Sequence, residues 1–431
     1  MKILIHSINF SPELTSTGKY TGEMAQWLAE RGHHVRVVTS PPHYPSWKVF
    51  DGYSPWRFKK ERWLSPSGSG VLEIFRCPLW IPRMPRGWRR LAYLVSFTLC
   101  SSPVMLAQAF WKPHLALQVE PTFFGSPQTL VCAWLSGAAS WLHIQDFEVD
   151  VAFQLTDLSS PLLRRWAHHI EGKFMAKFAR VSTISDRMVQ TLHAKGVESW
   201  RTILFPNWVN TAVIYPLADP SPLRHELGIS PDTIVALYSG NIGLKQGLRM
   251  ILDVSRQLAF RRDIHFVICG DGPEREKLVA MAQHLDNVRF LPLQPGNRLN
   301  DLLNLADIHL LPQLAGAADL VMPSKLTGIM ASGRAVVAAA DRGTQIATIL
   351  ENRGFATSSG NVDAFAAALL HLADDSELRR KMGEAARRYA IVHLNRDKIL
   401  LAIEHVFEQI CRIDSQSNQN GLAAKCTGTL N

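Results

Sequence analysis

The sequence has few cysteines, and none of them forms a CxxC pair. Six cysteines are scattered over 431 residues, so the pattern favours a reducing compartment over a disulfide framework or a zinc site. No secretory leader is recognised either, because Lys2 is followed by only three apolar residues before His6. Nucleic-acid-binding motifs are also missing, despite a formal net charge of +9. We therefore predict a cytoplasmic protein with no nucleic-acid partner.

Positive charge is unevenly distributed along the chain. Residues 1–205 contain 23 Lys and Arg against 14 Asp and Glu, whereas residues 206–431 contain 23 of each kind. The first half therefore carries the whole net charge of +9. Ten basic and three acidic residues lie between Lys48 and Arg90, where four tryptophans are interleaved with them. The four are Trp56, Trp63, Trp80 and Trp88.

An uncharged segment follows this basic stretch. Residues 91–111 have the length of a transmembrane helix, but Pro103 and a cluster of hydroxyl side chains interrupt the apolar run. A basic, tryptophan-rich stretch beside an apolar one is also typical of a helix that lies in a membrane surface. A buried helix behind a solvated basic loop is the third interpretation. We expect residues 48–111 to face a membrane as a peripheral contact.

Strand-like and helix-like segments alternate along the chain. Residues 2–8, 16–32 and 34–40 read as strand, amphipathic helix and strand, which predicts a βαβ unit with a parallel sheet. A second series of such units begins after a segment rich in proline and asparagine. Two α/β domains joined by a linker imply a cleft, with ligand at the carboxyl ends of the strands. The predicted parts are an N-terminal domain at 1–205, a linker at 206–222, a C-terminal domain at 223–385, a helix at 386–410 and a disordered tail at 411–431.

Two glycine-rich loops of the second half follow predicted strands. Residues 239–247 (SGNIGLKQG) let the backbone approach a ligand closely, and Lys245 adds a positive charge that suits a phosphate. Residues 269–274 (CGDGPE) place Gly270 and Gly272 in a tight turn. Neither loop is a GxGxxG fingerprint or a P-loop, so binding of a nicotinamide cofactor or of ATP at a P-loop loses its main support. Ordinary glycine turns are the alternative for both.

A third loop, residues 319–333 (DLVMPSKLTGIMASG), carries an oddly placed lysine. Ser324 is predicted as a helix N-cap, with Lys325 near the positive end of that helix and Asp319 on the loop before it. A lysine in the first turn opposes the helix dipole. It becomes favourable if an anion is bound there, and an exposed lysine without a ligand is the alternative.

Loops after the predicted strands of the first half carry further polar residues. Residues 9–23 place Gly18 before a helix, and residues 41–45 (PPHYP) hold His43 and Tyr44 in a turn restricted by prolines.

An acidic trio follows a predicted strand at residues 143–150. Asp146, Glu148 and Asp150 could hold a divalent cation, or they could line a solvated strand edge or cap a helix. We expect no metal here.

Together these loops resemble the retaining family-4 nucleotide-sugar glycosyltransferases. The resemblance spans the chain to about residue 410 and implies the GT-B fold, with two Rossmann-like parallel-sheet domains facing across a cleft. Within the family, the sequence is most similar to the colanic-acid-type fucosyltransferase branch of bacterial polysaccharide synthesis. The segments that carry it are SPELTSTGKYTGEMAQWLAERGHHVRVVTSPPHYP, HIQDFEVD, FPNWVN, YSGNIGLKQG, CGDGP and MPSKLTGIMASGRAVV.

The resemblance also implies roles for individual residues. The implied catalytic residues are Lys245, Asp319 and Asp146. The implied donor-binding residues are Gly18, Asn241, Gly243, Gly270, Gly272, Ser324, Lys325 and Thr327. His43 and Tyr44 are implied on the acceptor side.

The sequence departs from the family pattern at these loops. Asn241 and Gln246 stand where many relatives have arginine and lysine. Asp319 and Thr327 keep the spacing of the family's E-x7-E pair but only one of its acids. Thr327 can accept or donate a hydrogen bond, but it cannot replace the charge of a carboxylate.

The implied activity is retaining transfer of a sugar, with GDP-fucose as the suggested donor, to a lipid-linked or glycan acceptor in exopolysaccharide synthesis. The implied location is the cytoplasmic face of the inner membrane. No cofactor is expected, because lysines and helix-end amides can stabilise the departing diphosphate without a metal. A nucleotide-dependent oxidoreductase and a non-catalytic subunit that binds nucleotide sugars are the alternatives.

Overall fold

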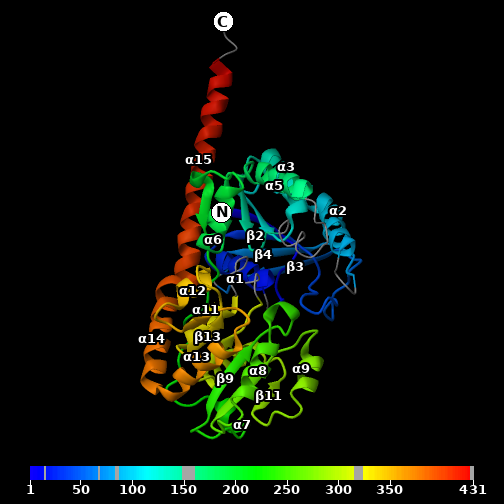
Figure 1. The fold of residues 1–431 in the computed structure, drawn as a ribbon. Coiled ribbons are helices and arrows are strands. Elements are labelled where there is room, and N and C mark those ends of the chain that lie inside the picture. The colour runs from blue at the N-terminus through cyan, green and yellow to red at the C-terminus, as the bar shows by residue number, and fades with distance from the viewer. Residues whose placement is uncertain (14–15, 67, 83–86, 148–160, 315–323, 428–431) are drawn as a thin grey trace. The chain divides into compact units, whose positions relative to one another are not determined.

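The computed structural model (Figure 1) divides the chain into two compact units. The first unit comprises Met1–Pro206 and Leu400–Asn431, and the second comprises Asn207–Ile399. The residues that the structure describes are 1–13, 16–66, 68–82, 87–147, 161–314 and 324–427.

A mainly parallel sheet forms the centre of the first unit. Its strands are β1 (Lys2–Ser7), β2 (His34–Thr39), β3 (Lys59–Leu64), β4 (Val71–Arg76), β5 (Leu115–Glu120), β6 (Ala139–Ile144), β7 (Arg180–Thr183) and β8 (Thr202–Leu204). They are ordered β3-β4-β2-β1-β5-β6-β7-β8, with only the edge pair β3–β4 antiparallel among the described strands. Ile3 lies opposite both Val35 and Leu115. These central strands are apolar on both faces because helices cover both sides of the sheet.

Helices of the first unit alternate with its strands, as the sequence predicts. They are α1 (Ser16–Glu30), α2 (Trp88–Trp111), α3 (Ser126–Ser136), α5 (Pro161–Met175) and α6 (Asp186–Ala194), with short 3-10 helices η1 (Phe123–Gly125) and η2 (Ser199–Arg201). The hydroxyl of Ser185 accepts a hydrogen bond from the Met188 amide and caps α6. The antiparallel strands β3 and β4 were not predicted, because their charged and aromatic residues obscure the alternation of polar and apolar residues that is typical of a strand.

The helix α2 is continuous over 24 residues although Pro103 lies inside it. It is long and apolar enough to cross a membrane by length and composition alone. Lys112 adopts a left-handed conformation, with φ of 55°, and closes the helix. The interruption predicted at Pro103 therefore does not break the helix.

A parallel sheet also forms the centre of the second unit. Its strands are β9 (Ile234–Ser239), β10 (Ile264–Cys269), β11 (Val288–Leu291), β12 (Ile308–Leu311), β13 (Ala335–Ala339) and β14 (Phe355–Thr357). They are ordered β11-β10-β9-β12-β13-β14. Phe266 and Val267 of β10 belong to different hydrophobic clusters, one on each face of the sheet. The strand order reverses between β9 and β12, which is where doubly wound sheets bind ligands.

The second unit also contains the helices that flank this sheet. They are α7 (Pro222–Glu226), α8 (Arg249–Gln257), α9 (Arg275–Met281), α10 (Leu299–Leu305), α11 (Ser324–Ser332), α12 (Gln345–Leu350), α13 (Val362–Asp374) and α14 (Ser376–His393), with 3-10 helices η3 (Leu244–Gln246) and η4 (Gly296–Arg298). The two α/β domains predicted from the sequence are therefore confirmed.

The predicted linker belongs to the second unit. Residues 207–222 pack on it through hydrogen bonds: Asn304 donates to the Tyr215 carbonyl at 2.9 Å, and Arg387 donates to the carbonyls of Ile214 at 2.7 Å and Thr211 at 2.9 Å. The aperiodic segment that was predicted as an interdomain linker is therefore irregular in structure and packs on the second unit.

The C-terminal segment also differs from its prediction. The single helix predicted at 386–410 is two helices, because α14 ends at His393 and α15 (Arg396–Thr427) begins after a break. The carboxamide oxygen of Asn395 accepts from the Lys398 amide at 3.0 Å and caps the new helix. The tail predicted to be disordered from residue 411 continues this helix to Thr427.

Buried contacts explain why the end of the chain belongs to the first unit. Glu404 on α15 accepts from the ring of His33 at 2.7 Å and pairs with Arg31 at 3.0 Å. Phe407 packs edge-on against Trp141, with ring centroids 4.8 Å apart. A buried hydrogen bond to His33, a half-exposed ion pair with Arg31 and one aromatic contact thus hold α15 on the first unit.

Candidate functional site

Two glycine loops meet at the carboxyl ends of β9 and β10. Gly270 has φ of 148°, and a Cβ there would lie 1.9 Å from the carbonyl oxygen of Gly240. The Ile242 amide donates to the Asp271 carbonyl at 2.8 Å, and the Glu274 amide donates back to Ile242 at 3.1 Å. The loops are therefore one backbone-bonded unit in which Gly270 cannot carry a side chain.

The side chain of Lys325, from the first turn of α11, lies against these loops. Its ammonium nitrogen lies 4.2 Å from the ring centroid of Tyr238 and donates a hydrogen bond to the Tyr238 hydroxyl. That hydroxyl in turn donates to the Asn241 carbonyl at 2.5 Å. A Cβ on Gly240 would lie 2.3 Å from Cε of Lys325, so the bare backbone there makes room for the lysine.

This lysine is desolvated, and the described residues supply no carboxylate to pair with it. Burial lowers the pKa of Lys325 to about 7. Among the residues that the structure describes, no carboxylate forms an ion pair with Lys325. Asp319, the acid that was predicted to act at this site, lies outside the described residues. A desolvated, partly buried ammonium is unfavourable unless an anion pairs with it. It can gain a partner only from outside the described part, such as a ligand phosphate.

Other donor-side predictions of the second unit lie in α11 and in the glycine loop after β9. Ser324 begins α11, and its carbonyl accepts from the Thr327 hydroxyl at 2.8 Å. Thr327 is buried, so its hydroxyl supports the first turn of the helix. A Cβ on Gly243 would lie 2.8 Å from the Gln246 carboxamide and 3.1 Å from that of Asn241.

A Cβ on the remaining glycine of this group, Gly272, would lie 2.4 Å from the Ile242 carbonyl. Gly272 therefore belongs to the interlocked loops, and its donor-binding role stays a prediction. Lys245 lies in η3, but its side chain is outside the described part of the structure. The catalytic roles of Lys245 and Asp319 stay predictions.

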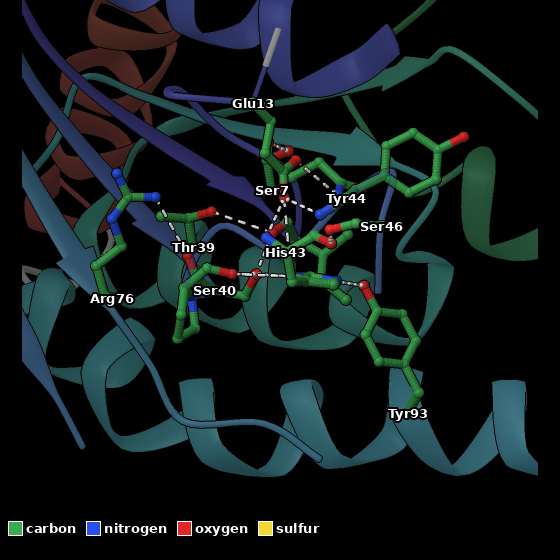
Figure 2. Close-up of polar contacts among 12 residues, drawn as sticks. Ser7, Glu13, Thr39, Ser40, His43, Tyr44, Ser46, Arg76 and Tyr93 are labelled. Atoms are coloured by element: carbon green, nitrogen blue, oxygen red, sulfur yellow. Dashed lines mark hydrogen bonds and ion pairs between the residues drawn. The ribbon is translucent and has the colours of Figure 1, made fainter. Parts of the chain in front are cut away.

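A second polar cluster lies at the strand ends of the first unit (Figure 2). Glu13 is buried, and one of its carboxylate oxygens accepts from the backbone amides of His43 and Tyr44, both at 2.9 Å. The other oxygen accepts from the Asn9 carboxamide at 2.9 Å. The carboxylate thus ties the loop after β1 to the loop after β2.

The ring of His43 is completely buried beneath this loop. Its Nδ1 donates to the Pro41 carbonyl at 2.8 Å, since a carbonyl can only accept. Nε2 therefore accepts from the Tyr93 hydroxyl at 2.8 Å (Figure 2). Burial lowers the pKa of His43 and keeps the ring neutral, although the Glu13 charge opposes this. The direct acceptor contact predicted for His43 is incompatible with this geometry, and the ring supports the loop instead.

Tyr44, at the tip of this loop, is half-buried, and its acceptor-side role stays a prediction. Burial raises the pKa of its phenol, and the Asp146 charge acts in the same direction. Asp146 follows β6 and is half-buried, so these two predicted residues lie near one another. Gly18 lies in the first turn of α1, where a Cβ would be 2.8 Å from a carboxylate oxygen of Glu13. Gly18 thus serves the packing of Glu13 within the first unit.

Three buried residues of these clusters were missed in the sequence. Glu13 stood inside the loop at residues 9–23 without an assigned role. Tyr238 is the last residue but one of β9, just before a glycine loop, a position that identifies it in retrospect. Arg76 donates to the carbonyls of Ser11 at 2.6 Å and Ser40 at 3.2 Å (Figure 2), but it lies on the strand β4, which was not predicted.

No group of three or more His, Cys, Asp or Glu side chains is arranged to hold a metal within the described ranges. Glu148 and Asp150, the partners proposed for Asp146, lie outside those ranges. The expectation that no metal is bound therefore stays a prediction.

Comparisons with known proteins cover both units. Residues 16–208 match the glycosyl transferase 4-like domain, and residues 221–389 match glycosyl transferases group 1. A protein of Escherichia coli (strain K12), described as the colanic acid biosynthesis glycosyl transferase WcaI, is 39% identical over 420 residues, covering 93% of this chain and 98% of that protein.

Solved structures share the fold at lower identity. Sucrose-phosphate synthase from Thermosynechococcus elongatus has a TM-score of 0.71 at 18% identity, covering 95% of this chain and 98% of that chain. HepE of Anabaena, in complex with UDP, has a TM-score of 0.68 at 15% identity, covering 95% and 100%. The sequence matches over both units, together with the two parallel sheets, show that the chain belongs to the GT-B glycosyltransferases of the group 1 and 4-like family.

Proposed function

We propose that the chain transfers a sugar, with retention, from a nucleoside diphosphate sugar to a saccharide acceptor of a bacterial cell-envelope polysaccharide. The observation that carries the proposal is Lys325, a desolvated ammonium beside interlocked glycine loops at the reversal of strand order. The relative named for colanic acid biosynthesis supports the polysaccharide class, and HepE, solved with UDP, supports a nucleotide ligand.

The second unit is assigned to the donor. In the reaction, the bond between the anomeric carbon and the diphosphate oxygen breaks, and the acceptor oxygen bonds to that carbon on the same face. The acceptor proton passes to the departing phosphate oxygen, so no protein nucleophile is needed. The ammonium of Lys325 and the free amides of the first turn of α11 offset the charge that develops on the diphosphate.

The first unit is assigned to the acceptor. The Tyr44 phenol is half-buried at the tip of a loop that Glu13 holds by two amide hydrogen bonds, so it offers a fixed polar group to a saccharide. Asp146 lies within its electrostatic reach. The further assignments are GDP-fucose as donor, a lipid-linked saccharide as acceptor, no metal or other cofactor, and a peripheral place at the cytoplasmic face of the inner membrane.

A thermal-shift screen with GDP, UDP and NAD tests the ligand class. We expect one nucleoside diphosphate to raise the melting temperature, because a ligand at a hundred times its dissociation constant adds about 2.7 kcal/mol of stability. Stabilisation by NAD alone would instead support an oxidoreductase. No response to any of the three would leave a non-catalytic subunit as the better interpretation.

A donor panel of GDP-fucose, GDP-mannose and UDP-sugars, with membranes that supply lipid-linked acceptor, tests the reaction. We expect transfer from one donor, with the anomeric configuration retained in the product by NMR. Lys245→Ala should abolish transfer without unfolding the protein, whereas Lys381→Ala, on the exposed surface of α14, should have no effect. Full activity of a folded Lys245→Ala variant would remove that lysine from the mechanism.

A further inference from the structure

The outward face of α2 is apolar along its whole length. The exposed large side chains are Trp88, Leu91, Leu99, Leu106 and Phe110, with Phe110 90% exposed. At 100° per residue, these positions fall within about one third of the helix circumference. These side chains therefore form one continuous apolar stripe on α2. The helix itself lies on the outside of the first unit (Figure 1).

The buried face of α2 includes two polar side chains, Ser101 and Gln108, among apolar and aromatic ones. The Ser101 hydroxyl lies 3.2 Å from Nε2 of His6, and Gln108 accepts from Arg36 at 3.1 Å. Both α2 residues are buried. A helix on the surface of a water-soluble domain instead has polar residues on its outer face. Water is therefore a poor match for the outer face of α2.

The helix α3 extends the same apolar surface. Gln128 joins the two helices, donating to the Thr98 carbonyl at 2.5 Å and the Ser102 hydroxyl at 2.7 Å. Val131, Trp134 and Leu135 are exposed on α3, and Phe124 is exposed on the η1 turn before it. No charged residue occurs between Ser126 and Ser136. We call the exposed apolar residues of α2, η1 and α3 the α2–α3 face; contiguous apolar surfaces of this kind mark contact sites.

Basic residues border the α2–α3 face. Arg89 and Arg90 lie in the first turn of α2, and Lys112 follows its last turn. Exposed Trp56, Arg57 and Phe58 lie on a neighbouring loop. This loop is joined to α2 through two hydrogen bonds: the Leu79 amide donates to the Pro55 carbonyl, and the Trp80 amide donates to the Ser96 hydroxyl of α2.

We propose that the α2–α3 face seats the first unit on an anionic lipid bilayer, with α2 lying in the plane of the headgroups. Apolar side chains would enter the acyl boundary, while arginine, lysine and tryptophan would meet the phosphates. A symmetric contact with a second copy is disfavoured, because it would bring two basic borders together. The proposal rests on the proposed function, which already assigns the protein a peripheral place at a membrane. It adds which surface of the first unit makes the contact and that the lipids are anionic.

The inner face of α2 explains why the helix lies in the membrane surface and does not cross it. Phe97 and Met105 are packed in a buried cluster, and the Tyr93 hydroxyl donates to His43. Crossing the bilayer would break these contacts and place Ser101 and Gln108 in hydrocarbon without their present partners, which costs several kcal/mol per unpaired group.

Flotation of the full chain with vesicles of phosphatidylethanolamine and phosphatidylglycerol tests the proposal, without donor or acceptor present. We expect binding to these vesicles and much weaker binding to neutral phosphatidylcholine vesicles. Phe110→Glu and Leu99→Glu should each weaken binding roughly tenfold, because a carboxylate then enters the acyl boundary. The matched control is Phe260→Glu, at a 71% exposed phenylalanine of the second unit, which should bind like the unchanged protein.

Three results would overturn the proposal. Unchanged vesicle binding by both α2 variants would remove this face from the contact. Resistance to extraction at alkaline pH would indicate a spanning helix. A dimer in light scattering that Phe110→Glu dissociates would assign the face to a second copy. Donor hydrolysis by the unchanged protein, measured in solution, separates the two proposals: hydrolysis without vesicle binding sinks the surface alone, and vesicle binding without hydrolysis sinks the glycosyl transfer alone.

Discussion

The polar clusters at the strand ends of the two units differ in how their central charged side chain is paired. In the first unit, the buried carboxylate of Glu13 accepts three hydrogen bonds from groups of the same unit. In the second unit, the desolvated ammonium of Lys325 contacts a phenol and its ring, and no carboxylate of the described residues pairs with it. A buried charge whose hydrogen bonds are all supplied by the protein stabilises structure. A buried charge without a counter-ion indicates where a ligand of opposite sign binds.

Among the changes that test this difference between the units, Gly270→Ala should reduce stability and transfer most. The substitution separates the two interlocked loops of the second unit. The new Cβ would lie 1.9 Å from the Gly240 carbonyl oxygen at a φ of 148°. We expect a loss of more than about 3 kcal/mol in the free energy of unfolding of the second unit and no detectable transfer. Urea unfolding and a donor assay measure both.

The matched control is Gly296→Ala, where no described atom lies within 4 Å of the added Cβ and φ is not positive. It should stay within about 0.5 kcal/mol of the unchanged protein. Equal stability of the two variants would contradict the interlocked loops.

Lys325→Ala removes the cation that distinguishes the second cluster. We expect nucleoside diphosphate binding to weaken and transfer to fall about a hundredfold, because one charge-stabilising group is lost from the transition state. The fold should persist, since no carboxylate in the described part of the chain depends on Lys325. Calorimetry with the diphosphate and a transfer assay check this, and unchanged affinity would remove Lys325 from the site.

The same lysine should make donor binding depend on pH. Burial lowers the pKa of Lys325 to about 7 in the free protein. A bound diphosphate raises it, so binding above pH 7 takes up a proton, and affinity should fall by up to about tenfold per pH unit as pH rises through that window. Below pH 7 the lysine is already charged and this dependence disappears.

Stability of the ligand-free second unit should change in the opposite sense. Between pH 7 and the ordinary lysine pKa near 10.4, the unfolded chain binds the proton that folded Lys325 has lost, so stability rises with pH. Lys325→Arg should flatten both profiles, since a guanidinium stays charged. A flat binding profile for the unchanged protein would show that this ammonium does not meet the diphosphate.

Glu13→Gln should have the smallest effect on transfer and should act on the first unit alone. The NH2 group of the glutamine carboxamide would face N–H donors whose hydrogen bonds the carboxylate accepted, so at least one of these bonds is lost. We expect a loss of about 1–3 kcal/mol in the free energy of unfolding. The KM for acceptor should rise because the Tyr44 loop loosens, while donor hydrolysis stays unchanged. A change in diphosphate affinity would contradict the division of roles between the units.

Much of the fold was predictable because its signals are local. The βαβ rhythm of residues 2–40 needs only the periods of helix and strand, and it appears as β1, α1 and β2. The glycine loops after β9 and β10 were found for the same reason. The break at Asn395 was missed because both sides of it have helical periodicity.

The partners within each cluster were not predictable, because they are far apart in the chain. Glu13 reaches an amide 30 residues away, and Lys325 reaches Tyr238 across 87 residues. His43 was predicted in a turn restricted by prolines, on the acceptor side of the site. Only packing against Tyr93 shows that its ring is internal.

The sequence by itself determined two α/β units, the glycine loops at their strand ends and the basic and apolar stretches of the first half. These properties follow from composition and from periods of a few residues. The tertiary structure alone decided which charges are paired, which side of α2 meets solvent and which predicted residues are buried. Burial and ion pairing depend on segments that the chain brings together only after folding, so no local pattern contains them.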